Sequence, residues 1–163
     1  KYLRQLFSSG VKMELRERLI GVWALVSWQS TLDGEFHGYP FGREARGRLT
    51  YNANGTMSAI LMKPDRRSFS DASLARGSAA ELEEAARGYV SYAGRFTVVG
   101  NEVHHLVDLS LLPNWIGTTL VRQVSWTDDL PPRLCLSTRP ERTGSGRLVA
   151  NQLVWQKVAA ADA

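Results

Sequence analysis

The sequence predicts an all-β fold, an eight-stranded antiparallel up-and-down barrel with a short N-terminal helix and one inserted helix. Two observations carry this prediction. Eight segments are rich in β-branched and aromatic residues, as strands are. These segments follow one another through short turns, which favours antiparallel neighbours. Eight such strands closed on themselves enclose packed side chains or one small ligand.

The first elements are a helix and a strand. Residues 13–19 carry leucines four apart and opposite charges at i,i+4, which is typical of a short helix. Residues 20–29 then change to β-branched and aromatic residues, and strict alternation places Trp23 and Trp28 on opposite faces. Tyr39-Pro40-Phe41-Gly42 indicates a loop or edge segment, because proline cannot donate to a strand ladder.

Turn residues separate the remaining strands. Asn52-Ala53-Asn54-Gly55 predicts a hairpin with glycine where positive φ is needed, and Gly100-Asn101 predicts a two-residue hairpin loop. Pro131-Pro132 and Gly144-Ser145-Gly146 precede the last two strands. The eight predicted strands are residues 20–29, 47–52, 56–63, 94–99, 102–109, 118–127, 133–138 and 147–158.

One helix interrupts this series after a polar loop at residues 64–77. Ser78 and Glu81 form a capping-box pattern, and the alanine, leucine and glutamate that follow predict a helix over residues 78–92. Gly88 weakens its last turn. The expected apolar stripe of this helix consists of Leu82, Ala85, Ala86 and Tyr89.

Length and composition indicate one domain. We assign residues 13–160 to it and expect residues 1–12 to be an N-terminal extension or a remnant of cloning. The single cysteine, Cys135, excludes an internal disulfide and fits a reducing compartment, so we expect a cytoplasmic protein. No run of about 18 apolar residues exists, which excludes a membrane-spanning helix.

The net charge of +4 raises the question of nucleic acid. The arginines are scattered, and the aromatic residues lie within predicted apolar strands instead of alternating with basic residues on one face. We therefore expect no nucleic-acid partner and no membrane partner. A monomer and a homodimer both stay open, since nothing marks an interface.

Short motifs along nearly the whole chain, from about Leu19 to Val158, form a recognisable series that begins with Gly21-Val22-Trp23. Further motifs are Tyr39–Gly42, Gly55–Ala59, Met62–Arg66, Arg87–Tyr89, His104-His105, Pro113–Gly117 with Arg122, and Leu153–Trp155. Their order and spacing resemble the lipocalin-like domain family of bacteria and fungi, a calycin-type β-barrel. The inserted helix and the lack of a disulfide depart from secreted lipocalins.

This resemblance implies a lipocalin-like barrel that binds a small molecule, without a cofactor. It also implies that Trp23 plugs the closed end of the barrel under a late-strand arginine, for which Arg122 and Arg147 are the candidates. Barrels similar to this family include cofactor-free cyclases and isomerases of natural-product pathways.

Two consecutive histidines are candidate catalytic residues. His104 and His105 lie on one predicted strand, so one side chain faces inward and the other outward. The inward histidine suits acid–base chemistry near neutral pH, or is a hydrogen-bonded core residue. With only His37 besides them, we expect no metal site.

Arg122 is the third catalytic candidate. On an inward face its charge needs a partner, which is Asp108, an acidic or enolic ligand, or the Trp23 ring. In the turn before it, Trp115 either covers a ligand or seals the core edge, and Asn114 either orients a carbonyl or forms the turn.

Aromatic and methionine side chains are candidates for the wall of a ligand cavity, with core packing as the alternative. On the predicted helix, Tyr89 and Tyr92 lie three apart on one side. The full set expected to bind a ligand is Tyr39, Tyr51, Met57, Met62, Tyr89, Tyr92, Asn114 and Trp115.

We expect the barrel to bind a small, largely apolar molecule of aromatic or polyketide-like character. The alternative function is a cofactor-independent isomerase, cyclase or lyase that acts on such a compound. In that case His104 or His105 is the general base, and Arg122 and Asn114 stabilise an enolate.

Overall fold

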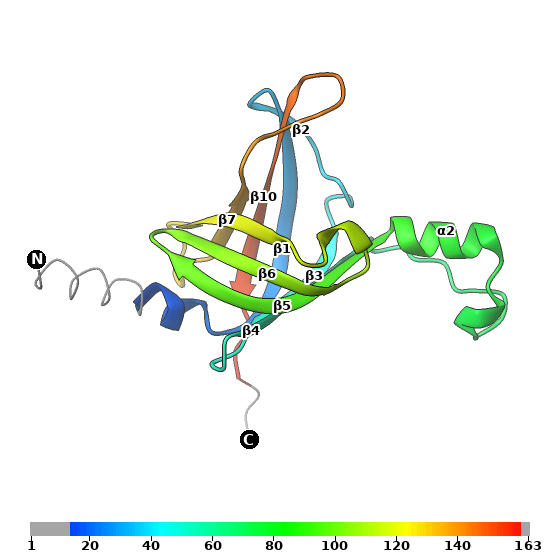
Figure 1. Ribbon diagram of the computed structural model, residues 1–163, viewed down its shortest axis with the longest axis horizontal. Coiled ribbons are helices and arrows are strands. Elements are labelled where there is room, and N and C mark those ends of the chain that lie inside the picture. The colour runs from blue at the N-terminus through cyan, green and yellow to red at the C-terminus, as the bar shows by residue number, and fades with distance from the viewer. Residues whose placement is uncertain (1–13, 161–163) are drawn as a thin grey trace, which may run out of the picture.

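The computed structural model describes residues 14–160, and in it the first barrel strand pairs with both its chain neighbour and the last strand, so the sheet closes (Figure 1). All pairings are antiparallel, and the predicted eight-stranded barrel is confirmed. The barrel strands are β1 (Gly21–Leu32), β3 (Arg46–Tyr51), β4 (Thr56–Met62), β5 (Tyr89–Val99), β6 (Glu102–Ser110), β7 (Thr119–Trp126), β8 (Leu134–Thr138) and β10 (Leu148–Lys157). Residues 14–19 form the expected helix.

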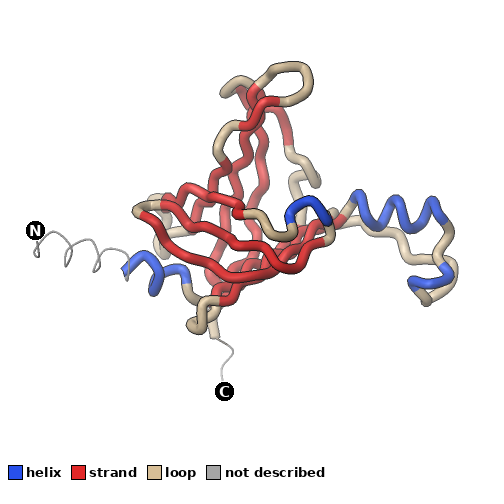
Figure 2. Tube along the Cα trace, in the orientation of Figure 1, coloured by secondary structure: helices blue, strands red, loops and turns tan. Residues whose placement is uncertain are grey.

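Two short strands lie outside this ring and were not predicted. β2 (Glu35–Gly38) pairs with β1, and β9 (Glu141–Arg142) pairs with β10. Both hairpins rise at the same end of the barrel (Figure 2). The carboxylate of Asp33 joins them, because it accepts hydrogen bonds from the backbone of Leu148 and from Arg147, both at 2.8 Å.

The helix predicted over residues 78–92 is too long at its C-terminal end. α2 spans Ala79–Arg87, Gly88 ends it, and β5 begins at Tyr89. The segment from Tyr89 to Tyr92 instead pairs with residues 59–62 of β4. Here tertiary pairing prevails over helix propensity, since Tyr-Val-Ser-Tyr is also a good strand sequence.

The segment from residue 63 to residue 88, called the arm below, extends away from the barrel (Figure 1). It contains the 3-10 turn η1 (Leu74–Arg76) and α2, and neither element buries a residue, so the expected apolar stripe of the helix faces no core.

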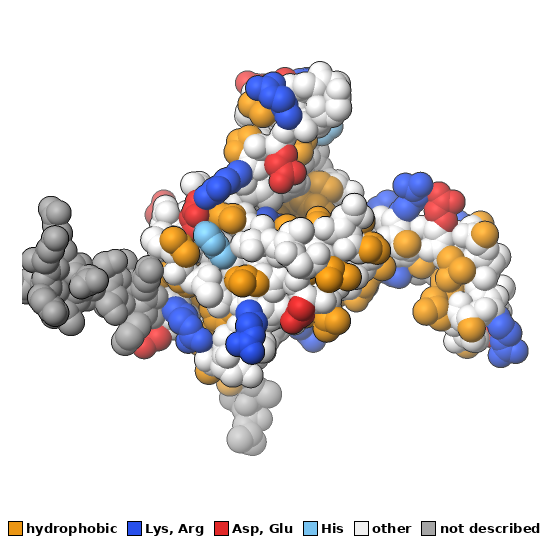
Figure 3. Space-filling model, in the orientation of Figure 1, with side chains coloured by type: hydrophobic (Ala, Val, Ile, Leu, Met, Phe, Trp, Pro, Cys, Tyr) orange, Lys and Arg blue, Asp and Glu red, His pale blue; other side chains and the backbone are white. Residues whose placement is uncertain are grey.

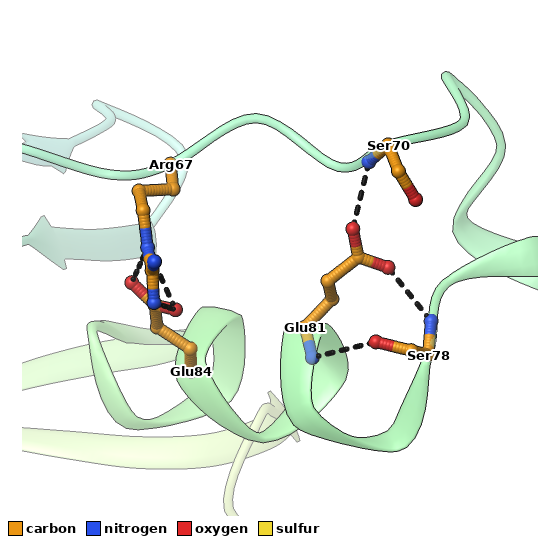
Figure 4. A network of polar contacts seen from close by, with 5 residues as sticks. All are labelled: Arg67, Ser70, Ser78, Glu81 and Glu84. Carbon is orange, nitrogen blue, oxygen red and sulfur yellow. Dashed lines mark hydrogen bonds and ion pairs between the residues drawn. The ribbon is translucent and has the colours of Figure 1, made fainter.

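Polar contacts hold the arm together (Figure 4). Glu81 accepts from the backbone nitrogens of Ser70 and Ser78, and Ser78 in return caps the helix, so the predicted capping box is confirmed. Arg67 forms a two-pronged ion pair with Glu84.

The hydrophobic core fills one end of the barrel. Its most deeply buried hydrophobic side chains are Leu19, Trp23, Leu49, Tyr51, Met57, Ala59, Val103, Leu134 and Trp155. The helix at residues 14–19 contributes Leu19, whose carbonyl accepts the indole N–H of Trp23 at 2.8 Å. Trp23 therefore lies on the floor of the barrel, and the other end stays less filled. No helix within residues 14–160 has the length and apolar character of a membrane span.

Candidate ligand-binding site

A cavity of about 220 Å³ lies inside the barrel, between the core at one end and the β2 and β9 hairpins at the other. In the space-filling view the surface is hollowed beside these hairpins, with hydrophobic side chains inside the hollow (Figure 3). The cavity wall comprises Trp28, Leu49, Ala59, Leu61, Val90, Tyr92, His105, Trp115, Leu120, Arg122, Leu136, Thr138, Glu141, Val149, Asn151, Leu153 and Trp155.

Strand alternation explains most of this wall. β10 contributes every second residue from Val149 to Trp155, β7 contributes Leu120 and Arg122, and β4 contributes Ala59 and Leu61. A closed sheet turns one face of each strand toward the interior. All eight barrel strands thus contribute to the cavity wall, and Glu141 of β9 and Trp115 are added from outside the ring.

Trp28 is an exception to strict alternation. A bulge in β1 between Leu25 and Ser27 shifts the register against β10. As a result Trp28 lines the cavity although it lies an odd number of residues from the inward Trp23. The prediction that alternation puts the two tryptophans on opposite faces is therefore wrong.

His105 lies between two tyrosines at the bottom of the cavity. Its Nε2 is 2.6 Å from the Tyr51 hydroxyl, and its Nδ1 is 3.0 Å from the Tyr92 hydroxyl. The ring is only 1% exposed. Burial lowers the pKa of His105 to about 3, and the charges of Arg122 and His104 act in the same direction. His105 is therefore a neutral imidazole at physiological pH, with one donor and one acceptor nitrogen.

We assign the ring proton to Nδ1, and the two distances are consistent with that tautomer. The shorter contact suits a Tyr51 hydroxyl that donates to Nε2, and the longer one suits Nδ1–H donating to the oxygen of Tyr92. With this assignment the Tyr92 hydroxyl keeps its own hydrogen free to donate. Burial raises the pKa of both tyrosines, so both stay protonated.

Arg122 places a cation in this mostly apolar wall. Its side chain is partly buried, and its guanidinium donates a hydrogen bond to the backbone oxygen of Val121 at 3.0 Å. Among the described residues no carboxylate forms an ion pair with it. Asp108, proposed from the sequence as a partner, is exposed on β6, so that prediction is wrong.

Two further polar groups of the wall have different surroundings. The indole of Trp28 donates to Asn151 at 2.8 Å, and the backbone of Asn151 donates to Thr138. The indole nitrogen of Trp155 is buried and has no hydrogen-bond partner within residues 14–160. A buried donor without an acceptor costs free energy, but surrounding atoms cover this nitrogen, so it does not open onto the cavity.

The loop between β6 and β7 covers part of the cavity. It forms the 3-10 turn η2 (Pro113–Trp115), and the Trp115 ring meets Tyr92 edge-on, with centroids 5.6 Å apart. Trp115 therefore lines the cavity as expected from its turn position. Asn114 is exposed and does not line it.

The structure places the other sequence candidates away from the cavity. His104 faces outward and contacts Glu102 at 3.0 Å, as alternation with His105 requires. Tyr51 and Met57 lie in the core beneath the cavity. Met62 and Tyr89 form a cross-strand pair outside it, where Arg66 lies over the Tyr89 ring. Tyr39 contacts Phe36 and Arg43 near β2.

The cation over Trp23 is also different from the one expected. Lys157 lies 5.2 Å from the Trp23 ring. In the β1–β10 pairing, Trp23 is opposite Lys157, whereas Arg147 precedes the far end of β10 and binds Asp33. The register of these two strands therefore gives the position over Trp23 to Lys157, and Arg122 contributes to the cavity wall instead.

Sequence reasoning missed Trp28, Asn151 and Trp155, which contribute much of the wall. The alternation on β10 was a usable signal for Asn151 and Trp155, whereas the bulge that turns Trp28 inward left no trace in the sequence. For metal binding, no group of three or more histidine, cysteine or acidic side chains comes together in the part of the chain that the structure describes.

Comparisons with known proteins agree with this architecture. The sequence model of the lipocalin-like domain family matches residues 20–158. The chain is also similar to the 4'-hydroxy-3'-methoxypropiophenone carrier protein ppsC of Aspergillus oryzae, with 36% identity over 110 residues. That alignment covers 63% of this chain and 96% of the Aspergillus protein. With its closed barrel and a match over most of its length, the chain belongs to the lipocalin-like domain family.

Proposed function

We propose that this protein binds and carries a small, largely apolar compound of aromatic or polyketide-like character inside its barrel. The single observation that carries the proposal is the cavity of about 220 Å³, walled by three tryptophans and a tyrosine among aliphatic side chains. The fold and the carrier relative both support the binding or carrying of a small molecule.

The size of the cavity limits the ligand. Sites for drug-sized molecules span roughly 300–1,000 Å³, so this cavity suits a compact molecule such as one substituted aromatic ring. The aryl ketone in the name of the Aspergillus carrier is a molecule of that kind. Aromatic side chains offer edge-to-face and stacked contacts to such a ring. The few polar groups on the wall suit the oxygen substituents.

The same geometry disfavours the catalytic alternative. A general base needs a free nitrogen and a pKa near the working pH. Both ring nitrogens of His105 contact tyrosine hydroxyls, and burial lowers its pKa to about 3. His104 lies on the outer face. We therefore propose binding without turnover as the function.

Tryptophan fluorescence tests the proposal directly, because Trp28, Trp115 and Trp155 line the cavity. We expect 4'-hydroxy-3'-methoxypropiophenone to quench this fluorescence in a saturable, one-to-one manner. Ala59 lines the cavity and Ile60, the next residue of β4, is exposed. Ala59→Phe should therefore weaken binding by about tenfold or more, whereas Ile60→Phe should not change it.

Circular dichroism of both variants checks that the barrel is intact, and Leu61→Trp provides a second way to fill the cavity if Ala59→Phe does not fold. The absence of saturable binding in the wild type, or equal binding by folded Ala59→Phe, would contradict the proposed site.

A further inference from the structure

The cavity wall contains a cation whose hydrogen-bonding capacity is largely unused. A guanidinium has five N–H donors, and Arg122 donates one hydrogen bond to the carbonyl of Val121. Its cross-strand neighbours are Val103 and Thr138, and neither carries a charge. A partly buried charge in such surroundings is costly unless a counter-charge accompanies it.

The titratable groups around Arg122 do not supply that counter-charge. Tyr51, Tyr92 and His105 are the buried groups whose proton equilibria the Arg122 charge affects, and all three are neutral. Glu141 of β9 lines the cavity but is exposed and forms no ion pair with Arg122. The Arg122 charge thus has no direct ion-pair partner within the described wall.

A second donor lies beside this cation. The tautomer assigned above leaves the hydroxyl hydrogen of Tyr92 free, and Arg122 is close enough to favour the phenolate of Tyr92 electrostatically. Arg122 and Tyr92 thus offer two donors on one mostly apolar wall, and the carboxylate on that wall, Glu141, forms no ion pair with Arg122.

We infer that the cavity binds its aromatic ligand as an anion, with an ionised oxygen held by Arg122 and the Tyr92 hydroxyl. This inference rests on the proposed function and specifies the class of ligand, an aromatic compound with an acidic hydroxyl or a carboxylate. Charge-assisted hydrogen bonds are about twice as strong as neutral ones, so the ionised form of a weakly acidic ligand binds more tightly.

A nitrophenol tests this inference, because its phenolate absorbs visible light and its neutral phenol does not. The phenol's pKa, read from that absorption, should fall by about one unit on binding to the wild type, which corresponds to roughly tenfold tighter binding of the phenolate. Arg122→Gln should abolish the shift. Arg95→Gln removes the same charge from the exposed face of β5 and should leave the shift unchanged.

A parallel titration with 4-hydroxy-3-methoxybenzoate and with its methyl ester shows whether the bound anion is a carboxylate or a phenolate. In both cases Arg122→Lys, which keeps the charge but lacks the planar fork, should retain part of the preference for the anion. Circular dichroism establishes that each variant is folded.

The outcomes separate the two proposals. A nitrophenol that binds with an unchanged or raised pKa, or a shift that persists in folded Arg122→Gln, would overturn the anion site and leave the binding function standing. If neither the nitrophenol nor the neutral aryl ketone binds to the wild type, the proposed function itself is contradicted.

Discussion

The two ends of the barrel are built from the same strands and differ in what fills them. At the closed end, Leu19, Trp23 and Leu134 are at most 2% exposed and pack without a cavity. At the open end, Trp28, Leu120 and Leu153 are only partly buried around free space. The close packing at the closed end thus stabilises the fold. The side chains at the open end contribute less to stability and are available to contact a ligand.

Truncating one tryptophan at each end tests this difference in packing most strongly. Trp23→Ala should lower the free energy of unfolding by about 4 kcal/mol, because it empties the core and removes the bond to the carbonyl of Leu19. Trp115→Ala, on the half-buried turn over the cavity, should cost less than about 2 kcal/mol but weaken ligand binding. Urea denaturation measures both, and equal losses would remove the distinction between the two ends.

A close approach of two strands provides the next test. A Cβ added to Gly94 of β5 would lie 1.9 Å from the carbonyl oxygen of Leu106 on β6. Gly94→Ala should therefore destabilise the barrel by about 3 kcal/mol, since backbone has to move. Gly144→Ala is the matched control, because nothing lies within 4 Å of its Cβ position. A small effect of Gly94→Ala would show that β5 and β6 can separate easily.

The buried histidine at the boundary between the two ends makes stability depend on pH. Unfolded His105 takes up a proton near its ordinary pKa of 6.5, whereas the folded protein does so only near 3. As pH falls between these values, the unfolded state binds more protons, and stability falls by up to about 1.4 kcal/mol per pH unit. His105→Leu lacks this contribution, so its stability deficit should shrink as pH falls through that window. A constant deficit would show that the folded and unfolded states protonate His105 over the same pH range.

The smallest effect on stability is expected from a substitution in the arm, which extends away from both ends of the barrel. Ser78→Ala removes the N-cap of α2 and should cost the helix about 1 kcal/mol. Because α2 buries no residue, hydrogen exchange should accelerate at residues 79–87 while the melting temperature of the barrel stays unchanged. Faster exchange in β4 and β5 as well would mean that arm and barrel unfold together.

Local sequence patterns were sufficient for the elements that depend on local interactions. Alternation and turn residues predicted the eight barrel strands, and Ser78 with Glu81 predicted the start of α2. They failed for β2 and β9, whose side chains are mostly exposed and therefore show no apolar period. They also failed at Tyr89, where pairing with Met62 decides the conformation.

The ligand-binding site was harder to predict from local patterns, because its residues are far apart in the chain. Tyr51 and His105 are 54 residues apart and yet their side chains share a hydrogen bond. Nothing near either residue indicates this contact, which arises only when the sheet closes. Arg122 could be identified as an inward candidate from its apolar neighbours, but whether a carboxylate meets it depends on the positions of the other strands.

The central claim is that the cavity holds a compact aromatic molecule and returns it unchanged. Native mass spectrometry of the protein incubated with 4'-hydroxy-3'-methoxypropiophenone, followed by chromatography of the released compound, tests both parts. We predict a one-to-one complex in the wild type, its loss in folded Ala59→Phe, and a released compound with unaltered retention time. No complex in the wild type, a complex that persists in that variant, or a released isomer would contradict it.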